Sequence, residues 1–318
     1  MKPGDMKAAV FTRYGGNDTI EVRDVPIPAL RPDEVLIRVR AAGVNPVDWK
    51  VREGHARILT GGKFPKILGI EFAGEIAGLG THAKKHSKGD PVIANAGMRL
   101  GAFAEFVAVA EKAVFPKPQH VSFEDAATLP IAGLTALQAL RDKGKIAPGM
   151  NVLINGAAGG VGTFAVQIAK VYGARVTAVC SAGNADLVRS LGADRLLDHR
   201  QQDFTKEGET YDIIFDAVSK RSFGECKRAL TRRGVYVNTL PGASIFWSIF
   251  LTSVLPGRKA ATMMVDQRAV DVAWLCDQIG AGKIKVVRDT VYTLDHVREA
   301  LAHSETGTAK GKIVLNVP

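Results

Sequence analysis

The 318-residue chain is predicted to be an α/β protein of two domains, one of which contains a doubly wound parallel sheet. Three observations support this prediction. The chain is longer than the roughly 250–300 residues at which single hydrophobic cores stop growing. Closely spaced strand patterns give way, near residue 126, to strands that alternate with helices. A glycine-rich turn at residues 156–162 joins an apolar strand to a helical pattern.

Strands are expected wherever short β-type segments lie between turn-forming residues. In the N-terminal part these segments are 7–11, 20–25, 34–44, 74–79, 90–94 and 103–109. The later strands are 151–154, 175–180, 211–216, 234–239 and 260–265, with helical patterns between most of them. That alternation predicts a parallel sheet with helices on both faces. From about residue 272 mixed elements return, and they end in a strand at 312–315.

The glycine-rich turn indicates a dinucleotide site. The fingerprint of such sites is G-x-G-x-x-G, and here Ala157 takes the first glycine position, followed by Gly159 and Gly162. Small residues let backbone N–H groups approach a diphosphate, and the positive end of the helix dipole faces its charge. We therefore expect Ala157, Gly159, Gly160, Val161 and Gly162 to bind the cofactor. The alternative is a tight turn that binds no nucleotide.

The choice of nucleotide depends on the residues about 20 positions after the fingerprint, where an acidic side chain would select NAD. This chain has Ser181 and Asn184 there, and no carboxylate before Asp186. Both side chains can donate hydrogen bonds to a 2′-phosphate, and Arg189 and Arg200 are nearby cations. The pattern favours NADP(H).

Composition is that of a globular protein, with 46% hydrophobic and 23% charged residues. The net charge of +10 is compatible with nucleic acid, an acidic membrane surface or a basic surface around an anionic cofactor. Three cysteines lie far apart, so neither a disulfide framework nor a cysteine zinc site is expected, and a reducing compartment is favoured. No signal peptide is expected, and the most apolar run, 245–255, is too short for a membrane span.

Several motifs together carry a family resemblance over nearly the whole chain. They are AAGVNPVDWK at 41–50, LGIEFAG at 68–74, AGLTA at 132–136, the turn at 156–162, SLGAD at 190–194 and GKIV at 311–314. On these motifs the chain resembles the medium-chain dehydrogenase/reductase superfamily. Within it, the chain is similar to the zinc-free quinone oxidoreductase and enone reductase branch, which includes the chloroplast-envelope quinone oxidoreductase homologues.

The resemblance implies a GroES-like β-barrel catalytic domain at residues 1–128 and 267–318, and a Rossmann NADP(H)-binding domain at 129–266. It also implies a cofactor in a cleft and a homodimer. The nicotinamide would lie beside Thr135, Leu240 and Gly242. The alternative for Thr135 is a hydroxyl that bonds back to its own helix.

Two further features follow from the resemblance. His199 stands where relatives carry a tyrosine beside the adenosine phosphate, although an exposed loop histidine fits equally well. The apolar segment with Phe246, Trp247 and Phe250 is expected to cap a substrate pocket, or else to pack in a dimer or in the core.

No metal site is expected. Zinc-bearing relatives place a ligating cysteine and histidine where this chain has Asn45 or Pro46, and Ile70. Neither an amide nor an isoleucine replaces thiolate or imidazole in a tetrahedral zinc site. His82 and His86 are four residues apart in a polar segment that reads as a solvated loop.

Chemistry without zinc favours hydride transfer to an already electrophilic carbon, because no Lewis acid stabilises an alkoxide. Charge then builds on a carbonyl oxygen, for which Asn45 and Lys50 are candidate donors. Better-known members of the branch carry a tyrosine at the position of Lys50, so proton delivery is left to Lys50, the cofactor ribose or water. Alternatively, Asn45 holds a turn, Asp48 anchors the backbone and Lys50 is a surface charge.

The function expected from the sequence is a cytoplasmic, zinc-independent, NADPH-dependent reductase of small hydrophobic α,β-unsaturated carbonyls or quinones. No specific nucleic-acid partner is expected, because aromatic stacking motifs and basic helices are absent from the sequence. One alternative is a catalytically weak NADPH-binding regulatory or RNA-binding protein. An alcohol or aldehyde dehydrogenase is the enzymatic alternative, disfavoured by the missing zinc ligands.

Overall fold

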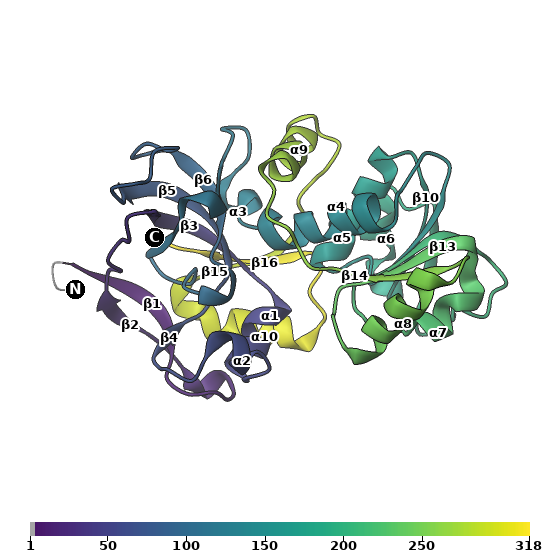
Figure 1. The fold of residues 1–318 in the computed structure, drawn as a ribbon, viewed down its shortest axis with the longest axis horizontal. Coiled ribbons are helices and arrows are strands. Elements are labelled where there is room, and N and C mark those ends of the chain that lie inside the picture. Colours follow the sequence, from purple (N-terminus) through teal and green to yellow (C-terminus); the bar gives the residue numbers. More distant parts are fainter. Residues whose placement is uncertain (1–3) are drawn as a thin grey trace. The chain divides into compact units, whose positions relative to one another are not determined.

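The computed structural model describes residues 4–318, which form two compact units. The first unit comprises the chain up to Pro130, with Gln267–Gly280 and Arg288–Pro318; the second comprises Ile131–Asp266 and Ala281–Val287. The boundaries expected from the resemblance differ from these in two places. The first boundary was expected after residue 128 and lies after Pro130, and residues 281–287 were expected in the first unit but belong to the second. Figure 1 labels the elements of both units.

The first unit is built from two sheets. Strands β1 (Asp5–Phe11), β2 (Ile20–Pro26) and β4 (Lys66–Ile67) form an antiparallel sheet in the order β2-β1-β4. The larger sheet has the order β15-β16-β3-β5-β6-β8, and β7 also pairs with β3. Its strands are β3 (Glu34–Val44), β5 (Glu71–Leu79), β6 (Pro91–Asn95), β7 (Phe106–Ala110), β8 (Val114–Pro116), β15 (Arg288–Thr293) and β16 (Lys312–Asn316).

Strand β3 organises this unit because it pairs antiparallel with β5, β7 and the closing strand β16. Alternate side chains of β3, such as Val35, Ile37 and Val39, are fully buried, which is the pattern of a strand with one face in the core. The helices of the unit are α1 (Pro46–Arg52), α2 (Arg57–Thr60), α3 (Phe123–Ala126), α9 (Ala269–Gly280) and α10 (Val297–Thr306).

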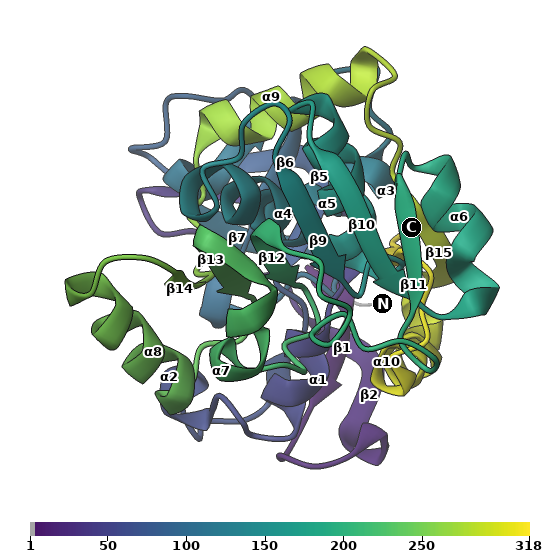
Figure 2. The ribbon, with the colours of Figure 1, turned by 90° about the vertical axis from the view of Figure 1, so that its right-hand side faces the viewer.

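The second unit contains a six-stranded sheet in which every pairing is parallel. Its order is β11-β10-β9-β12-β13-β14, with helices around it (Figure 2). The strands are β9 (Asn151–Asn155), β10 (Arg175–Cys180), β11 (Arg195–Asp198), β12 (Tyr211–Asp216), β13 (Leu230–Asn238) and β14 (Lys259–Thr262). Numbered within the unit the order is 3-2-1-4-5-6, the doubly wound dinucleotide-binding order. The predicted parallel sheet is therefore confirmed.

The helices of this unit are α4 (Leu134–Gln138), α5 (Gly160–Val171), α6 (Ala185–Ser190), α7 (Phe223–Cys226) and α8 (Ala243–Val254). Helix α4 is extended by wide π-type turns at 129–133 and 139–143, so the helical run is continuous over these residues. Pro130 and the β-branched Ile131 and Thr135 in this run are poor helix formers, and the buried Leu134 and Leu137 supply the packing that holds it.

Two buried glutamines fasten the second unit where the chain enters and leaves it. The Gln138 side chain donates to the Asp266 carbonyl (2.7 Å) and accepts from the Asp266 N–H (3.0 Å). Gln167 on α5 makes the same pair of bonds with Lys285, at 2.9 and 2.7 Å. Each amide thus donates to and accepts from the backbone of one residue, as a neighbouring strand would. The two bonds of Gln167 with Lys285 tie residues 281–287 to this unit.

Candidate functional site: a glycine turn and a buried polar cluster

The glycine turn lies between β9 and α5 and leaves backbone N–H groups available to a ligand. The N–H groups of Gly156 and Ala157 donate to the Val179 carbonyl at 3.1 and 3.0 Å, which folds the turn back onto β10. Helix α5 begins at Gly160, with Gly159 as its N-cap. The first N–H groups of a helix have no acceptor within it, so those of Gly160–Gly162 can bind an anion.

Glycine is required at two positions of this turn. A Cβ on Gly162 would lie 2.1 Å from the Gly156 carbonyl oxygen, so any side chain would push the turn off the helix. Gly156 has a φ of +83°, and a Cβ there would lie 2.5 Å from Val218. Ala157 is fully buried, so its methyl group fits where the fingerprint has its first glycine. Sequence reasoning missed Gly156, although a glycine directly after a buried strand was the available signal.

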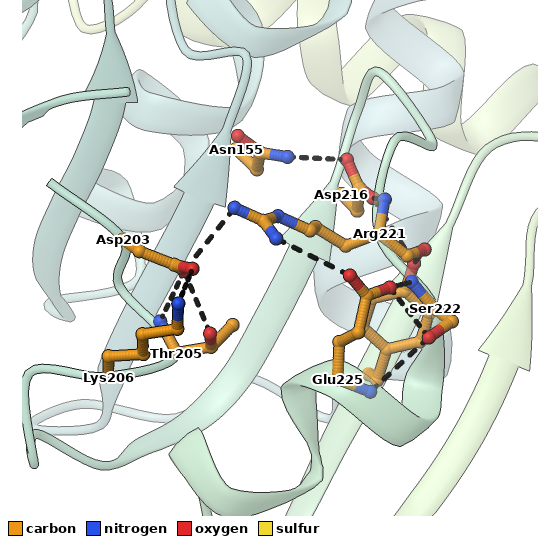
Figure 3. Close-up of polar contacts among 9 residues, drawn as sticks. Asn155, Asp203, Thr205, Lys206, Asp216, Arg221, Ser222 and Glu225 are labelled. Carbon is orange, nitrogen blue, oxygen red and sulfur yellow. Dashed lines mark hydrogen bonds and ion pairs between the residues drawn. The ribbon is translucent and has the colours of Figure 1, made fainter. Parts of the chain in front are cut away.

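The end of β12 lies beside this turn. Asp216 and Asn155 are register partners, and the Asn155 amide donates to the Asp216 carboxylate at 2.9 Å (Figure 3). The buried carboxylate also accepts from the N–H groups of Val218 and Arg221 and from the Tyr236 hydroxyl. The order of the strands reverses between β9 and β12, because successive strands are added on one side of β9 up to β11 and on its other side from β12 onwards. Open α/β sheets bind ligands at such a point, outside the carboxyl ends of the strands. Asp216 therefore shapes the loop beside the expected cofactor site, and the sequence offered no signal for it.

Arg221 ties that loop to its surroundings, as Figure 3 shows. Its guanidinium lies 3.3 Å from Asp203 and 3.4 Å from Glu225, and it stacks over the Phe204 ring. Hydrogen bonds from the Thr205 and Ser222 hydroxyls, with the Arg221 charge, hold the pKa values of Asp203 and Glu225 below their usual range. Because the Arg221 guanidinium is already paired with these two carboxylates, we infer that Arg221 orders the loop.

The residues expected to contact a 2′-phosphate gather at the ends of β10 and β11. The Ser181 carbonyl accepts from the Asn184 N–H at 2.9 Å, and the His199 N–H donates to the Cys180 carbonyl at 3.2 Å. Parallel pairing of β10 with β11 thus brings Ser181 and His199 together at the carboxyl ends of these two strands. Arg189 is 2.8 Å from Asp186, so that cation already has a partner.

The other cofactor residues predicted in this unit lie as follows. Leu240 and Gly242 are exposed residues between β13 and α8, and the Asn238 amide donates to the Leu240 carbonyl at 3.1 Å. Thr135 is buried on α4. The Asn238 side-chain oxygen is buried and makes no hydrogen bond within the described residues.

The first unit contains a buried polar cluster around Asn45. The Lys312 ammonium donates to the Asn45 amide oxygen (2.6 Å), the Glu71 carboxylate (2.7 Å) and the Val44 carbonyl (3.2 Å). The Asn45 NH₂ group donates to the same Glu71 oxygen at 2.7 Å, and more weakly to the Gly43 carbonyl at 3.4 Å. Lys312 and Glu71 are almost completely buried, so this ion pair determines the orientation of the amide.

Lys312 and Glu71 were not predicted as site residues, although both lie in motifs of the resemblance. Strand β16 pairs Ile313 with Val44, which carries Lys312 to the start of α1. Strand β5 pairs Glu71 with Gly43 from the other side of β3. The cluster is therefore a product of strand pairing, which no local pattern reveals.

Asp48 anchors the same turn, as the structural alternative proposed. Its carboxylate accepts from the Asn45 N–H at 2.8 Å and closes a capping box at the start of α1. Burial raises the pKa of Asp48 to about 7, with a further rise from the Glu71 charge and a partial offset from the Asn45 N–H and Lys312. The second Asp48 oxygen is buried and makes no hydrogen bond within residues 4–318.

Lys50, the second predicted donor, lies on α1 and is partly exposed. Its ammonium stands 5.3 Å from the centroid of the Trp49 ring, a cation–π contact. Lys50 thus differs from the buried Lys312, whose three donors are all engaged within the protein.

The residues at the positions where zinc-bearing relatives hold their ligands do not fit zinc. Ile70 is buried and apolar, and the Asn45 amide oxygen already accepts from an ammonium, which repels a second cation. Among the described residues, no three His, Cys, Asp or Glu side chains converge in a group that could hold a metal ion. In the same part of the chain, no helix has the length and apolar character of a membrane span.

Comparison with known proteins agrees with both units. Residues 31–119 match the family described as alcohol dehydrogenase GroES-like domain, and residues 191–315 match the family described as zinc-binding dehydrogenase. The chain is 34% identical over 325 residues to a chloroplast envelope quinone oxidoreductase homolog of Arabidopsis thaliana, covering 98% of both chains. It is also 34% identical to an NADPH-dependent alkenal/one oxidoreductase, chloroplastic, of the same plant, covering 98% of this chain and 80% of that protein.

Among solved structures, the quinone oxidoreductase from Coxiella burnetii is similar over 99% of this chain and 100% of its own, with a TM-score of 0.92 and 30% identity. Full-length similarity of this kind covers the β-rich unit and the parallel-sheet unit together. The protein therefore belongs to the quinone oxidoreductase and enone reductase branch of the medium-chain dehydrogenase/reductase superfamily, with a GroES-like domain and a Rossmann domain.

Proposed function

We propose that this protein reduces α,β-unsaturated carbonyl compounds or quinones with NADPH. The observation that carries the proposal is the glycine turn of the Rossmann domain, with three helix N–H groups available to a diphosphate and no acidic side chain at the end of β10. The full-length relatives include a quinone oxidoreductase homolog and an alkenal/one oxidoreductase, which supports both classes of acceptor.

In this proposal the Rossmann domain binds the cofactor, which supplies the hydride when bound. The N–H groups at Gly160–Gly162 bind its diphosphate, while Ser181, Asn184 and His199 contact the 2′-phosphate. We assign Thr135, Leu240 and Gly242 to the nicotinamide end, as the resemblance implies.

The GroES-like domain supplies polar groups for the acceptor. We assign Asn45 and Lys50 as donors to the carbonyl oxygen, on which negative charge builds during reduction. One Asn45 N–H donates to Glu71 at 2.7 Å, so the Lys312–Glu71 pair holds the amide in place beforehand. The other N–H makes only a long contact of 3.4 Å with the Gly43 carbonyl, and it is the one that we assign to the acceptor oxygen. Of the two, we assign proton delivery to the partly exposed Lys50, because an ammonium can give up a proton and an amide cannot.

Replacing Asn45 by alanine is expected to lower turnover on enones by about 10²-fold, the usual cost of one lost oxyanion donor. Steady-state kinetics with NADPH and a 2-alkenal measure the effect, and a melting curve shows that the variant is folded. Asn316→Ala, an exposed asparagine on β16, is the matched control and should leave turnover unchanged. Near wild-type turnover in the Asn45 variant contradicts the assignment.

Replacing Ser181 by aspartate is expected to shift preference from NADPH towards NADH, because a carboxylate repels a 2′-phosphate and accepts from a ribose hydroxyl. The ratio of kcat/KM values for the two cofactors measures the shift. Ser190→Asp, on the exposed end of α6, adds the same charge away from the expected site. An unchanged ratio in Ser181→Asp would refute this phosphate site.

The activity is tested by following NADPH consumption with a panel of 2-alkenals, enones and quinones. Formation of the saturated carbonyl identifies an ene reductase, whereas consumption with quinones alone selects the quinone class. Tight NADPH binding without turnover on any acceptor contradicts the proposal and favours the regulatory alternative. The homodimer and the cytoplasmic location stay predictions, and the names of the two Arabidopsis thaliana relatives refer to the chloroplast.

A further inference from the structure

Ser219 has a left-handed backbone conformation in the loop that follows β12. It stands three residues after the strand, and its φ is +53°. Such a backbone disfavours any residue with a Cβ, whereas glycine adopts it without strain. Strain of this kind persists only where the surrounding structure holds it, and it concentrates at functional sites. The presence of a serine here therefore directs attention to the contacts of its side chain.

The Ser219 side chain forms a closed set of hydrogen bonds with Thr239, the first residue after β13. The Ser219 Oγ accepts from the Thr239 N–H at 3.1 Å, and the two hydroxyl oxygens lie 3.0 Å apart. Because the Thr239 hydroxyl donates to the Ala217 carbonyl at 3.2 Å, the Ser219 hydroxyl is the donor to Thr239. These three residues form the Ser219–Thr239 clamp, which joins the loop after β12 to the loop after β13.

Further contacts fix the first of these loops to the carboxyl end of the sheet. The Asp216 carboxylate accepts from the Val218 N–H at 3.3 Å, and the Ala217 N–H donates to the Asn155 carbonyl at 3.0 Å. Val218 is nevertheless 45% exposed, and a Cβ on Gly156 would lie 2.5 Å from its side chain. The clamped loop therefore presents an apolar side chain beside the glycine turn that we assign to the diphosphate.

We propose that the Ser219–Thr239 clamp positions the nicotinamide half of the cofactor, an inference that rests on the proposed function. A doubly wound sheet binds one nucleotide in each of its two halves. Ser181, at the end of β10, belongs to the half assigned to the adenosine, whereas the clamped loops follow β12 and β13 of the other half. The second loop continues into Leu240 and Gly242, which we assign to the nicotinamide. The clamp orders that loop before the cofactor binds, so binding does not have to supply the ordering.

The clamp acts through the loops and not on the reacting atoms. Both hydroxyl protons and the Thr239 N–H are already donated within the protein. Neither side chain therefore retains a donor for the cofactor, so Ser219 and Thr239 are positioning residues. Loss of the clamp should weaken binding of the nicotinamide half and leave binding of the adenosine half unchanged.

The test compares the binding of NADPH with that of 2′,5′-ADP, which contains the adenosine half alone, by titration calorimetry of the full chain. Thr239→Val removes the hydroxyl at nearly constant shape and should weaken NADPH binding by about fivefold, the usual effect of one hydrogen bond. Affinity for 2′,5′-ADP should stay unchanged. Thr239→Ser keeps the hydroxyl and should bind both ligands as the wild type does.

Substitutions of Ser219 separate the clamp from the backbone strain. Ser219→Gly relieves the strain and should melt at a higher temperature than Ser219→Ala, which keeps it. Both variants lose the clamp, so both should bind NADPH about tenfold more weakly and lower kcat by about tenfold, with 2′,5′-ADP binding retained. Thr308→Val removes a hydroxyl from the exposed Thr306–Thr308 pair of the GroES-like domain and should change neither affinity.

Three results would overturn the proposal. Variants that melt at a lower temperature but bind NADPH as tightly as the wild type would give the clamp a structural role alone. Equal losses of NADPH and 2′,5′-ADP binding would mean that the clamp does not act on the nicotinamide half. If the wild-type protein binds neither ligand, the proposed function itself fails, and this outcome is distinct because it appears without any substitution.

Discussion

Replacing Lys312 by methionine is expected to lower the free energy of unfolding by about 3–5 kcal/mol, because it leaves the Glu71 carboxylate buried without its cation. Methionine matches the length of the lysine side chain, so little volume is lost. The Asn45 amide oxygen loses its donor as well, which frees the amide to rotate. Chemical denaturation monitored by fluorescence measures the loss.

A matched control and a rescue separate charge from packing. Lys310→Met removes an exposed lysine two residues earlier and should change stability by less than about 0.5 kcal/mol. Adding Glu71→Gln to Lys312→Met removes the orphaned charge and should recover part of the loss. If Lys312→Met costs no more than Lys310→Met, the ion pair does not hold the Asn45 turn.

The second large effect concerns Asp48, whose carboxyl group makes the protein more stable in mild acid than in base. Its pKa rises from the ordinary 3.8 to about 7 because the group is fully buried. Between these values the folded protein keeps a proton that the unfolded chain releases, so the free energy of unfolding falls as pH rises. Above pH 7 both states are ionised and the loss is complete, at about 4 kcal/mol.

Replacing Asp48 by asparagine removes this titration. The difference in unfolding free energy between variant and wild type should move in the variant's favour by about 2–3 kcal/mol between pH 5 and pH 8. The measurement is a set of denaturation curves for both proteins across that range. Asp33→Asn, an exposed aspartate of the same domain, should show no such trend. A difference that does not change with pH would contradict a protonated Asp48 in the folded protein.

Local sequence patterns predicted the Rossmann half of the molecule well. Strands β10 and β12 have the predicted bounds because their apolar runs are buried on both faces of the sheet. Strands β11 and β15 were missed, since both are short and carry exposed charged or polar residues that resemble a loop. Strand β13 begins four residues before the prediction because the exposed Arg232 and Arg233 form part of its bulged start.

For the candidate site as well, the part that depends on local sequence was predicted and the part that depends on distant residues was not. The sequence alone determined the dinucleotide turn, because its requirements are local: a buried strand, residues that tolerate close packing and a helix that starts at once. Only the tertiary structure decided what surrounds Asn45, since its partners Glu71 and Lys312 are 26 and 267 residues away and arrive by strand pairing on either side of β3. The cost of burying the Lys312 and Glu71 charges is offset only when strand pairing brings the two side chains together. No local sequence pattern encodes that geometry.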